Sequence, residues 1–404
     1  MDKSATSKPV ILINTHVYPR TNNDHVAPFM HDFAKVVSKF ARVVVLCPHA
    51  PNLPTQEIID GIEIRRFRYA KEAKQTLAYQ GDMHKQVKRS PFKALLFFTF
   101  LRKWRRATKQ IIDELNPDII HAHWLIPGGY VTGKAIGKNN RSKLMISMHG
   151  TDVFLVNKLR LAKQLGKRSL NQATNHHYVS NALSEIIRQN YSLTDKTNLI
   201  LPMVFGLNRF ERRHQKTGNK RILFVGRLMQ VKGIDILIRA FSKLISLPDF
   251  VDWQLDIVGD GPEYDNLVKL AVENSSEQSI IFHGYKNRDQ IVGYYDNADL
   301  LVLPSKTTTL GEKEGLGLVV LEAMMSGVAV IGTTCGGIKE TIEHEVTGLI
   351  VNENDSEALY EAIRRMLSDA EFRQKMTDQA YQMVQEKYSQ ASLIATMKQF
   401  YGVD

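Results

Sequence analysis

The chain has 404 residues, which is more than one ordinary hydrophobic core accommodates, so two domains are expected. It has only two cysteines, Cys47 and Cys335, both in apolar strand-like contexts, which argues against a disulfide framework or a thiolate metal site. Residues 1–200 contain 31 Lys and Arg against 14 Asp and Glu, a net charge of +17, whereas residues 201–404 contain 22 against 28, a net charge of −6. This asymmetry predicts that the first half faces an anionic surface.

The N-terminal stretch lacks a long apolar segment, and no apolar run approaches the roughly 18 residues that would cross a bilayer. We therefore expect no signal peptide, no membrane-spanning helix and a cytoplasmic location.

Short apolar runs alternate with helical patterns along both halves, which predicts parallel sheets with crossover helices and an α/β fold. Many runs are apolar throughout, as expected for strands that are covered on both faces. The expected strands are 10–15, 42–48, 118–124, 143–149 and 176–180 in the first half, and 221–226, 253–259, 279–284, 299–304 and 328–332 in the second. The expected architecture is two Rossmann-like domains facing across a cleft, covering residues 1–205 and 206–385, with a linker at 209–220.

The loop after the first expected strand, residues 18–30, contains the sequence NNDH. Asn22, Asn23 or Asp24 is expected to cap a helix that starts near Val26.

Residues 71–110 are basic and aromatic, with 11 Lys or Arg and two acidic residues. This composition favours a helix lying in an anionic lipid interface, with Phe98, Phe100, Leu101 and Trp104 beside Arg102, Lys103, Arg105 and Arg106. The alternatives are a core helix with a solvated basic face, or a nucleic-acid surface, for which no recognised module is present.

Two histidine motifs end consecutive expected strands. HAHW places His121 and His123 at the end of one, and HGTD places His149 and Asp152 at the end of the next.

The second half begins with a strand followed by GRLMQVKG. Neither half has G-x-G-x-x-G after its first strand, which weighs against a nicotinamide or flavin enzyme, and a P-loop motif is also missing. Asp-x-Asp does not occur either, so a diphosphate site would rely on protein cations. Arg227 and Lys232 supply these at the strand end, where open α/β sheets bind ligands.

The stretch EGLGLVVLE places Glu314 in a loop that enters a helix and Glu322 about two turns along that helix. Two carboxylates suit sugar hydroxyls, while backbone N–H groups near Gly315 and Gly317 suit phosphate oxygens. The site is therefore expected to bind a sugar that carries phosphate.

Glu-x7-Glu, GR-x4-KG and HG-x-D resemble the motifs of retaining glycosyltransferases of family 4, which have the GT-B fold. The resemblance covers nearly the whole chain and is strongest over 221–351. It implies that a C-terminal helix, within 386–404, crosses back to the first domain. It also implies that the first domain binds the acceptor, the second domain binds the donor, and no metal is required. The sequence departs from many members in having NNDH where they have a glycine-rich loop.

The resemblance also implies residue roles. Catalytic roles fall on His149, Arg227, Lys232 and Glu314. Donor-binding roles fall on Gly226, Gly259, Tyr285, Gly315, Leu316, Gly317 and Glu322, with Glu322 at the ribose and Glu314 at the sugar. Acceptor-binding roles fall on Asp24, His123 and Asp152, and His25 is a further candidate for an acceptor contact. The alternative for His123 is a structural hydrogen bond, and the alternative for Asp152 is to cap the following helix.

The sequence therefore predicts a retaining, metal-independent transferase that moves a sugar from a UDP- or GDP-sugar to a saccharide or lipid-linked saccharide. The enzyme is expected to act in cell-surface polysaccharide synthesis, peripherally at the inner membrane face, and not on nucleic acid. A nucleotide-sugar epimerase of the same fold and a non-catalytic, membrane-bound sugar-nucleotide sensor remain alternatives.

Overall fold

The computed structural model describes residues 8–21, 24, 26–79, 83–137, 140–191, 198–212, 218–309, 311 and 313–404. The chain divides into two compact units, residues 1–206 with 390–404 and residues 207–389. Asn22, Asn23 and His25, which were candidates for a cap or an acceptor contact, lie outside the described residues.

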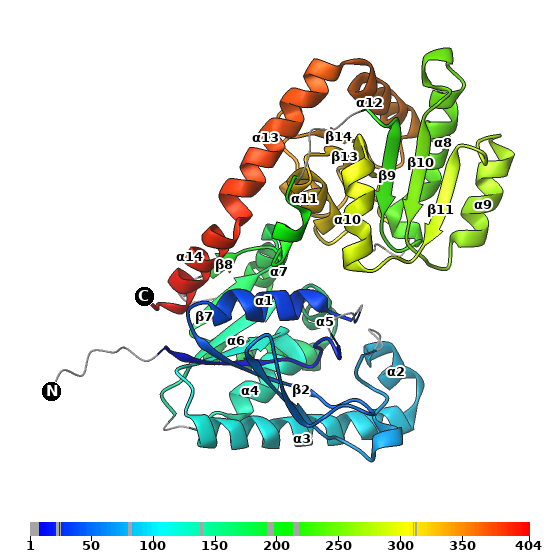
Figure 1. The fold of residues 1–404 in the computed structure, drawn as a ribbon. Helices are drawn as coiled ribbons and strands as arrows, with labels where there is room; N and C mark the ends of the chain where they lie inside the picture. The colour runs from blue at the N-terminus through cyan, green and yellow to red at the C-terminus, as the bar shows by residue number, and fades with distance from the viewer. Residues whose placement is uncertain are drawn as a thin grey trace. The chain divides into compact units, whose positions relative to one another are not determined.

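The first unit contains an eight-stranded sheet in the order β3-β4-β2-β1-β5-β6-β7-β8, in which only β3 and β4 pair antiparallel. Figure 1 shows α1 on one side of this sheet and α3 on the other. The elements are β1 (Val10–Asn14), α1 (Pro28–Ser38), β2 (Arg42–Pro48), β3 (Gln56–Ile59), β4 (Ile62–Phe67), α2 (Met83–Arg89), α3 (Pro91–Leu115), β5 (Ile119–His123), α4 (Tyr130–Ala135), β6 (Lys143–Met148), α5 (Thr151–Lys158), α6 (Arg160–Gln172), β7 (Asn175–Tyr178), α7 (Asn181–Asn190), β8 (Asn198–Ile200) and α14 (Gln390–Tyr401).

The second unit contains a six-stranded parallel sheet in the order β11-β10-β9-β12-β13-β14. Its elements are β9 (Arg221–Val225), the 3-10 turn η4 (Gln230–Lys232), α8 (Ile234–Ile245), β10 (Gln254–Val258), α9 (Tyr264–Glu273), β11 (Ile280–Gly284), α10 (Arg288–Asn297), β12 (Leu300–Leu303), α11 (Leu318–Met325), β13 (Ala329–Thr333), β14 (Leu349–Val351), α12 (Ser356–Ser368) and α13 (Ala370–Tyr388).

The prediction of two Rossmann-like α/β sheets is confirmed. In each sheet the direction of strand addition reverses once, between β1 and β5 in the first unit and between β9 and β12 in the second. Ligands of open α/β sheets bind at the carboxyl ends of the strands at such a reversal. A ligand site is therefore expected at the loops that follow β1, β5, β9 and β12.

Helix α14 belongs to the first unit, although it follows the second in sequence. The Tyr401 hydroxyl lies 2.7 Å from Nδ1 of His121, and Asn175 donates a 2.8 Å hydrogen bond to the carbonyl of Phe400. The expected return of the last helix to the first domain is thus present in the structure.

Three local predictions are wrong. Helix α1 begins at Pro28 rather than near Val26, and its N-cap residue, Ala27, has no side-chain cap, so Asp24 does not cap it. Helix α11 begins at Leu318, which places Glu322 little more than one turn along it. In α3, Phe100 and Trp104 are fully buried in the core, so they cannot face lipid.

Candidate functional site

A lysine and a glutamate meet at the strand reversal of the second unit. Lys232 ends the turn after β9, and its Nζ lies 2.6 Å from Oε2 of Glu314, in the loop before α11. Ser305, two residues after β12, donates a 2.9 Å hydrogen bond to the same oxygen. The loops after β9 and β12 therefore converge on the Glu314 carboxylate, at the edge where the topology predicts a ligand.

The Glu314 carboxyl is held in its charged form. Burial raises its pKa, but the charge of Lys232 and the hydrogen bonds from Lys232 and Ser305 together lower it by more. The pKa of Glu314 therefore lies below the ordinary value. Glu314 is thus an ion-pair partner for Lys232 rather than a proton donor at neutral pH.

Arg227 lies just beyond β9, and its side chain is exposed. It forms no ion pair with any residue that the structure describes, which leaves its guanidinium available for an anion. The backbone on either side is fixed, because Gly226 N donates to Val258 O and Leu228 N donates to Asp260 O, both at 3.0 Å. Arg227 is therefore an exposed cation on a loop whose backbone is held in place.

Gly259 and Gly261 allow the loop after β10 to pack against the loop after β9. A Cβ on Gly259 would lie 1.8 Å from the carbonyl oxygen of Gly226, and one on Gly261 would lie 2.4 Å from that of Leu228. Close packing of two loops accounts for these glycines, so the donor-binding roles of Gly226 and Gly259 stay predictions.

A second glycine pair, Gly336 and Gly337, supports the Glu314 loop. Cβ atoms there would lie 2.0 Å from the carbonyl oxygen of Glu314 and 2.1 Å from that of Gly315. The GG dipeptide was visible in the sequence, but the partner of its backbone was not. By contrast, a Cβ on Gly315 would meet open space, which leaves that backbone accessible.

Leu316 is buried, and Gly317 adopts a left-handed φ of 70° as the N-cap residue of α11. The donor-binding prediction for this segment therefore rests on its backbone.

Glu322 differs from Glu314 in its surroundings. The Tyr295 hydroxyl donates a 2.9 Å hydrogen bond to Oε2 of Glu322, and burial raises the pKa of this carboxyl, although the charge of Arg288 opposes the shift. Oε1 makes no hydrogen bond within the described part of the chain, so it can accept a ligand hydroxyl. The sequence offered no sign that Tyr295 would reach Glu322.

Tyr285 follows β11 and is 57% exposed, as a ring at the edge of a binding site would be. The preceding His283 is committed to the protein, because its Nε2 lies 2.7 Å from Asp256, which also binds Arg221. The nucleotide-base role of Tyr285 stays a prediction.

In the first unit, His149 lies at the carboxyl end of β6 against two aromatic rings. Trp124 stacks on it with centroids 4.1 Å apart, and Nδ1 of His123 lies 3.0 Å from Nε2 of His149. His16, in the loop after β1, packs edge-on to Trp124 at 4.5 Å. Residues from the ends of β1, β5 and β6 therefore meet at the strand reversal, and sequence analysis did not identify His16 and Trp124 among them.

The neighbouring hydrogen-bond chain has one direction. The Leu201 carbonyl can only accept, so His177 donates to it from Nε2 and accepts from Ser147 at Nδ1. Ser147 then accepts from Nε2 of His121, and Nδ1 of His121 accepts from Tyr401. Every link lies between 2.6 and 2.7 Å. This series of hydrogen bonds links α14 to the sheet, and both of its imidazole rings are neutral.

The same reasoning assigns the tautomer of His149. Nε2 of His123 is buried without a partner, and an unpaired buried N–H is rarer than an unpaired acceptor. His123 therefore carries its proton on Nδ1 and donates it to Nε2 of His149, which leaves the proton of His149 on Nδ1. Burial lowers the pKa of both rings well below the usual value, so both are neutral.

His123 is fully buried, so it cannot contact an acceptor directly, and the structure favours its structural alternative. Asp152 is 2% exposed and accepts hydrogen bonds from the backbone of Leu125, His149 and Gly150. It thereby joins the ends of β5 and β6 rather than capping α5.

Asp24 is paired with Arg20 at 2.7 Å. Burial raises its pKa, but the hydrogen bonds and charge of Arg20 lower it to about 2. Acceptor contacts by Asp24 and Asp152 stay predictions.

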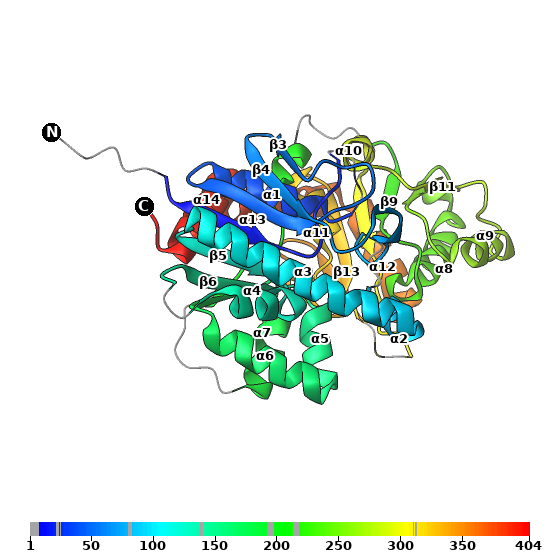
Figure 2. The same ribbon diagram turned by 90° about the horizontal axis from the view of Figure 1, so that it is seen from below.

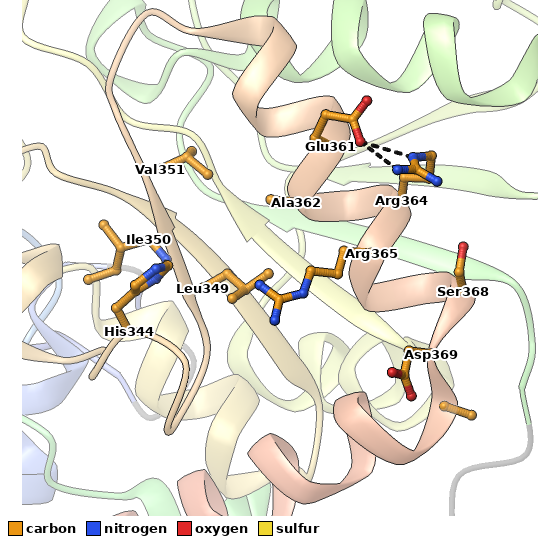
Figure 3. A pocket seen from close by; sticks show the side chains of 11 residues that line it. His344, Leu349, Ile350, Val351, Glu361, Ala362, Arg364, Arg365, Ser368 and Asp369 are labelled. Atoms are coloured by element: carbon orange, nitrogen blue, oxygen red, sulfur yellow. Dashed lines mark hydrogen bonds and ion pairs between the residues drawn. The ribbon is translucent and has the colours of Figure 1, made fainter.

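A hollow between β14 and α12, drawn in Figure 3, lies apart from all these residues in the sequence. Its arginines already have partners, since Arg364 pairs with Glu361 at 2.8 Å and Arg365 with Glu345 at 2.5 Å. Within the described ranges, no group of three or more His, Cys, Asp or Glu side chains could hold a metal ion.

Comparisons with known proteins give this geometry a context. The chain is 27% identical over 304 residues to N-acetyl-alpha-D-glucosaminyl L-malate synthase of Bacillus anthracis, which covers 72% of this chain and 76% of that protein. It is 32% identical over 167 residues to the amylovoran biosynthesis glycosyltransferase AmsK of Erwinia amylovora, or 41% of this chain and 40% of AmsK. The solved structure of Anabaena Alr3699/HepE in complex with UDP superposes with a TM-score of 0.69 at 18% identity, covering 98% of this chain and 99% of that one. This structural likeness confirms the GT-B fold.

Two family models match successive parts of the sequence. Residues 18–179 match the model described as glycosyl transferase 4-like, and residues 208–383 match the model described as glycosyl transferases group 1. Between them the two models cover most of both units. The chain therefore belongs to the glycosyl transferases, with a first part of the 4-like type and a second part of group 1.

Proposed function

We propose that the protein is a retaining, metal-independent glycosyltransferase that moves a sugar from a UDP- or GDP-sugar to a hydroxyl of a saccharide, in the synthesis of a cell-surface polysaccharide. The observation that carries the donor assignment is the Lys232–Glu314 pair at the strand reversal of the second unit, with the exposed Arg227 on the same segment after β9 as Lys232. Two cations at that edge suit a diphosphate. The structurally similar HepE was solved with UDP bound, which supports a nucleotide donor, and AmsK is named for the biosynthesis of amylovoran, which supports a role in polysaccharide synthesis.

In the proposed reaction, the acceptor hydroxyl forms a bond to the anomeric carbon as the bond from that carbon to the diphosphate oxygen breaks. The acceptor attacks from the side on which the diphosphate leaves, and a phosphate oxygen takes its proton. Arg227 and Lys232 stabilise the charge on the departing diphosphate. Glu314 positions Lys232 and the sugar, and Oε1 of Glu322 accepts from the ribose hydroxyls.

His149 presents its Nδ1–H to the donor sugar in this proposal. A neutral donor at that position can hold a sugar hydroxyl without placing a cation beside the reacting carbon. Retention is proposed from the Glu-x7-Glu motif, and independence from metal from the protein cations that take its place.

The test is a transfer assay with a panel of UDP-, GDP- and TDP-sugars, with and without lipid extract as a source of acceptor. Released nucleotide and the fate of the sugar are both measured. A transferase releases nucleoside diphosphate and forms a glycoside only when acceptor is present. Conversion of the donor without acceptor would indicate the epimerase, and donor binding without any turnover would indicate the sensor.

The K232A and E314A variants test the roles of the ion pair, and EDTA tests the independence from metal. K232A and E314A are each expected to lower transfer at least ~100-fold, because K232A removes a cation that stabilises the departing diphosphate and E314A removes the carboxylate that positions Lys232 and the sugar. Excess EDTA is expected to leave the rate unchanged. Wild-type turnover in either variant, or loss of activity that Mg²⁺ restores after EDTA, would contradict the assignment.

We also propose that the acceptor is linked to lipid and that the enzyme works peripherally at the inner membrane face. No helix in the described ranges is long and apolar enough to cross a bilayer. Peripheral attachment therefore requires a surface that binds lipid from one side.

A further inference from the structure

The corner between α5 and α6 exposes large apolar side chains. Phe154 is 50% exposed, Leu159 is 53% exposed and Leu161 is 69% exposed. Most large apolar residues of this unit are buried, and three exposed within eight positions form a cluster rather than scattered surface residues. We call these three residues the corner.

The surroundings of the corner are cationic. Residues 151–172 contain five Lys or Arg, all exposed, and their only acidic residue, Asp152, is buried against backbone N–H groups. None of the five forms an ion pair with a described residue. They are Lys158, Arg160, Lys163, Lys167 and Arg168.

Helix α3 repeats the same combination. Phe92, Leu95 and Phe98 are 55, 66 and 70% exposed, whereas Phe100 and Trp104 point into the core. One turn further along, the exposed side chains become basic, and these are Arg102, Lys103, Arg105 and Arg106.

The two surfaces belong to one face of the first unit. Helix α4 packs against both α3 and α6, and Figure 2 shows the three helices side by side on the side turned to the viewer, with α5 next to α6. The two apolar clusters, each with exposed basic residues near it in the sequence, thus lie on neighbouring helices of the first unit.

We propose that this face docks on an anionic bilayer, with the corner and the Phe92–Leu95–Phe98 edge of α3 as two separate apolar anchors. Anionic lipid is the occupant that fits, because apolar side chains enter the interface while unpaired Lys and Arg side chains meet lipid phosphates. The inference rests on the proposed function for the reason to bind a membrane, which is to reach a lipid-linked acceptor. Its test, vesicle binding, does not depend on that function.

The corner has a direct connection to the candidate site. Helix α5 starts immediately after His149 and Gly150, and Phe154 N donates a 2.9 Å hydrogen bond to the Gly150 carbonyl. Phe154 of the corner thus follows His149 by little more than one helical turn, so a bilayer that holds Phe154 would bring a lipid-linked acceptor close to the end of β6.

Vesicle co-sedimentation of the full chain tests the proposal. The wild-type protein is expected to bind phosphatidylglycerol-containing vesicles and to bind pure phosphatidylcholine vesicles much more weakly. L159S/L161S and R160E/K163E/K167E are each expected to lower the partition coefficient at least ~10-fold. The matched controls lie in the second unit, V251S/V272S for exposed apolar residues and R239E/K269E/K375E for exposed cations, and are expected to bind like wild type.

A second measurement reports insertion. Both native cysteines are buried, so a cysteine introduced on the surface can be labelled selectively. A polarity-sensitive dye on L161C or L95C is expected to shift to the blue on anionic vesicles, while the same dye on V272C stays unchanged. The proposal would be overturned by equal binding to neutral and anionic vesicles, by unchanged binding of the corner variants, or by the absence of a dye shift. It would also be overturned if this face bound a protein or a nucleic acid and that binding abolished the binding of vesicles.

Nucleotide binding separates this inference from the proposed function. Corner variants are expected to bind nucleoside diphosphate like wild type and to transfer normally to a water-soluble acceptor. Vesicle binding without any transferase activity would refute the proposed function but not the docking face. Transferase activity in a protein that does not bind vesicles would refute the docking face but not the proposed function.

Discussion

The ion pair between Lys232 and Glu314 offers a quantitative test of the donor site. The Nζ–Oε2 distance is 2.6 Å, and the two side chains are only 19 and 12% exposed. Removing one member of a mostly buried pair leaves the other charge without a partner, which typically costs ~3–5 kcal/mol. Because some water still reaches Lys232, we expect the lower end of that range for K232M and E314Q.

The double variant K232M/E314Q removes both charges and should recover most of this loss, giving a coupling energy of ~2 kcal/mol or more. Hydrogen exchange measured by mass spectrometry on peptides spanning β9 and β12 reports the free energy of opening of the second unit. Single variants within ~0.5 kcal/mol of wild type, or strictly additive effects, would refute the geometry described for this pair.

The same variants should have opposite effects on ligand binding. K232M removes a charged contact to the diphosphate, worth ~1.5–3 kcal/mol, so its nucleoside diphosphate affinity should fall ~10-fold or more. E314Q frees Lys232 from its carboxylate and should bind the diphosphate at least as tightly as wild type, although it transfers poorly. Calorimetric titration measures both, and weaker binding by E314Q would contradict the competition between Glu314 and the diphosphate.

Three further predictions concern the first unit. H123N places an amide N–H where Nδ1–H stands and should keep most transfer activity, whereas H123Q should lose ~10-fold or more; equal losses would argue against the assigned tautomer. Y401F leaves Nδ1 of His121 buried without a donor and should lower the free energy of unfolding by ~1–3 kcal/mol in urea titrations, and an unchanged midpoint would refute the chain. Asp24 has a pKa of about 2 in the folded protein against an ordinary value of 3.8, so its contribution to stability is present above 3.8 and lost as pH falls toward 2. The stability of D24N should be lower near neutral pH and flatter across that window, and parallel pH curves for the two proteins would contradict this.

The sequence predicted the ten main strands well, because runs such as RVVVLCP are buried on both faces and are therefore apolar throughout. It missed β3, β4, β8 and β14. Strands β3, β8 and β14 have only three or four residues and are partly exposed, so burial leaves little pattern in them, whereas β4 has six residues that alternate between buried and partly exposed rather than forming an apolar run. In α3 the apolar content was evident but the direction of its side chains was misjudged. Spacing of four residues places Leu96, Phe100 and Trp104 on one inward face, and Phe98 falls outside that row.

The sequence was enough to bring together Lys232 and Glu314 but not to predict the contacts of the candidate site, and the binding roles of its residues stay predictions. Strand-end positions were enough to place Lys232 and Glu314 at one edge, since parallel strands end together. The sequence could not show that these residues, 82 positions apart, pair directly, or that Tyr295 reaches Glu322. It also gave no sign that Trp124 stacks on His149, because such contacts depend on how neighbouring loops pack.

The most direct test of the central claim is the stereochemistry of the transferred sugar. The purified protein is incubated with the active donor from the panel and its acceptor, and the anomeric configuration of the early product is read by proton NMR. A retaining, metal-independent transferase should release nucleoside diphosphate one-to-one with a glycoside that has the configuration of the donor, in the presence of EDTA. An inverted glycoside, or donor conversion without a glycoside, would contradict it.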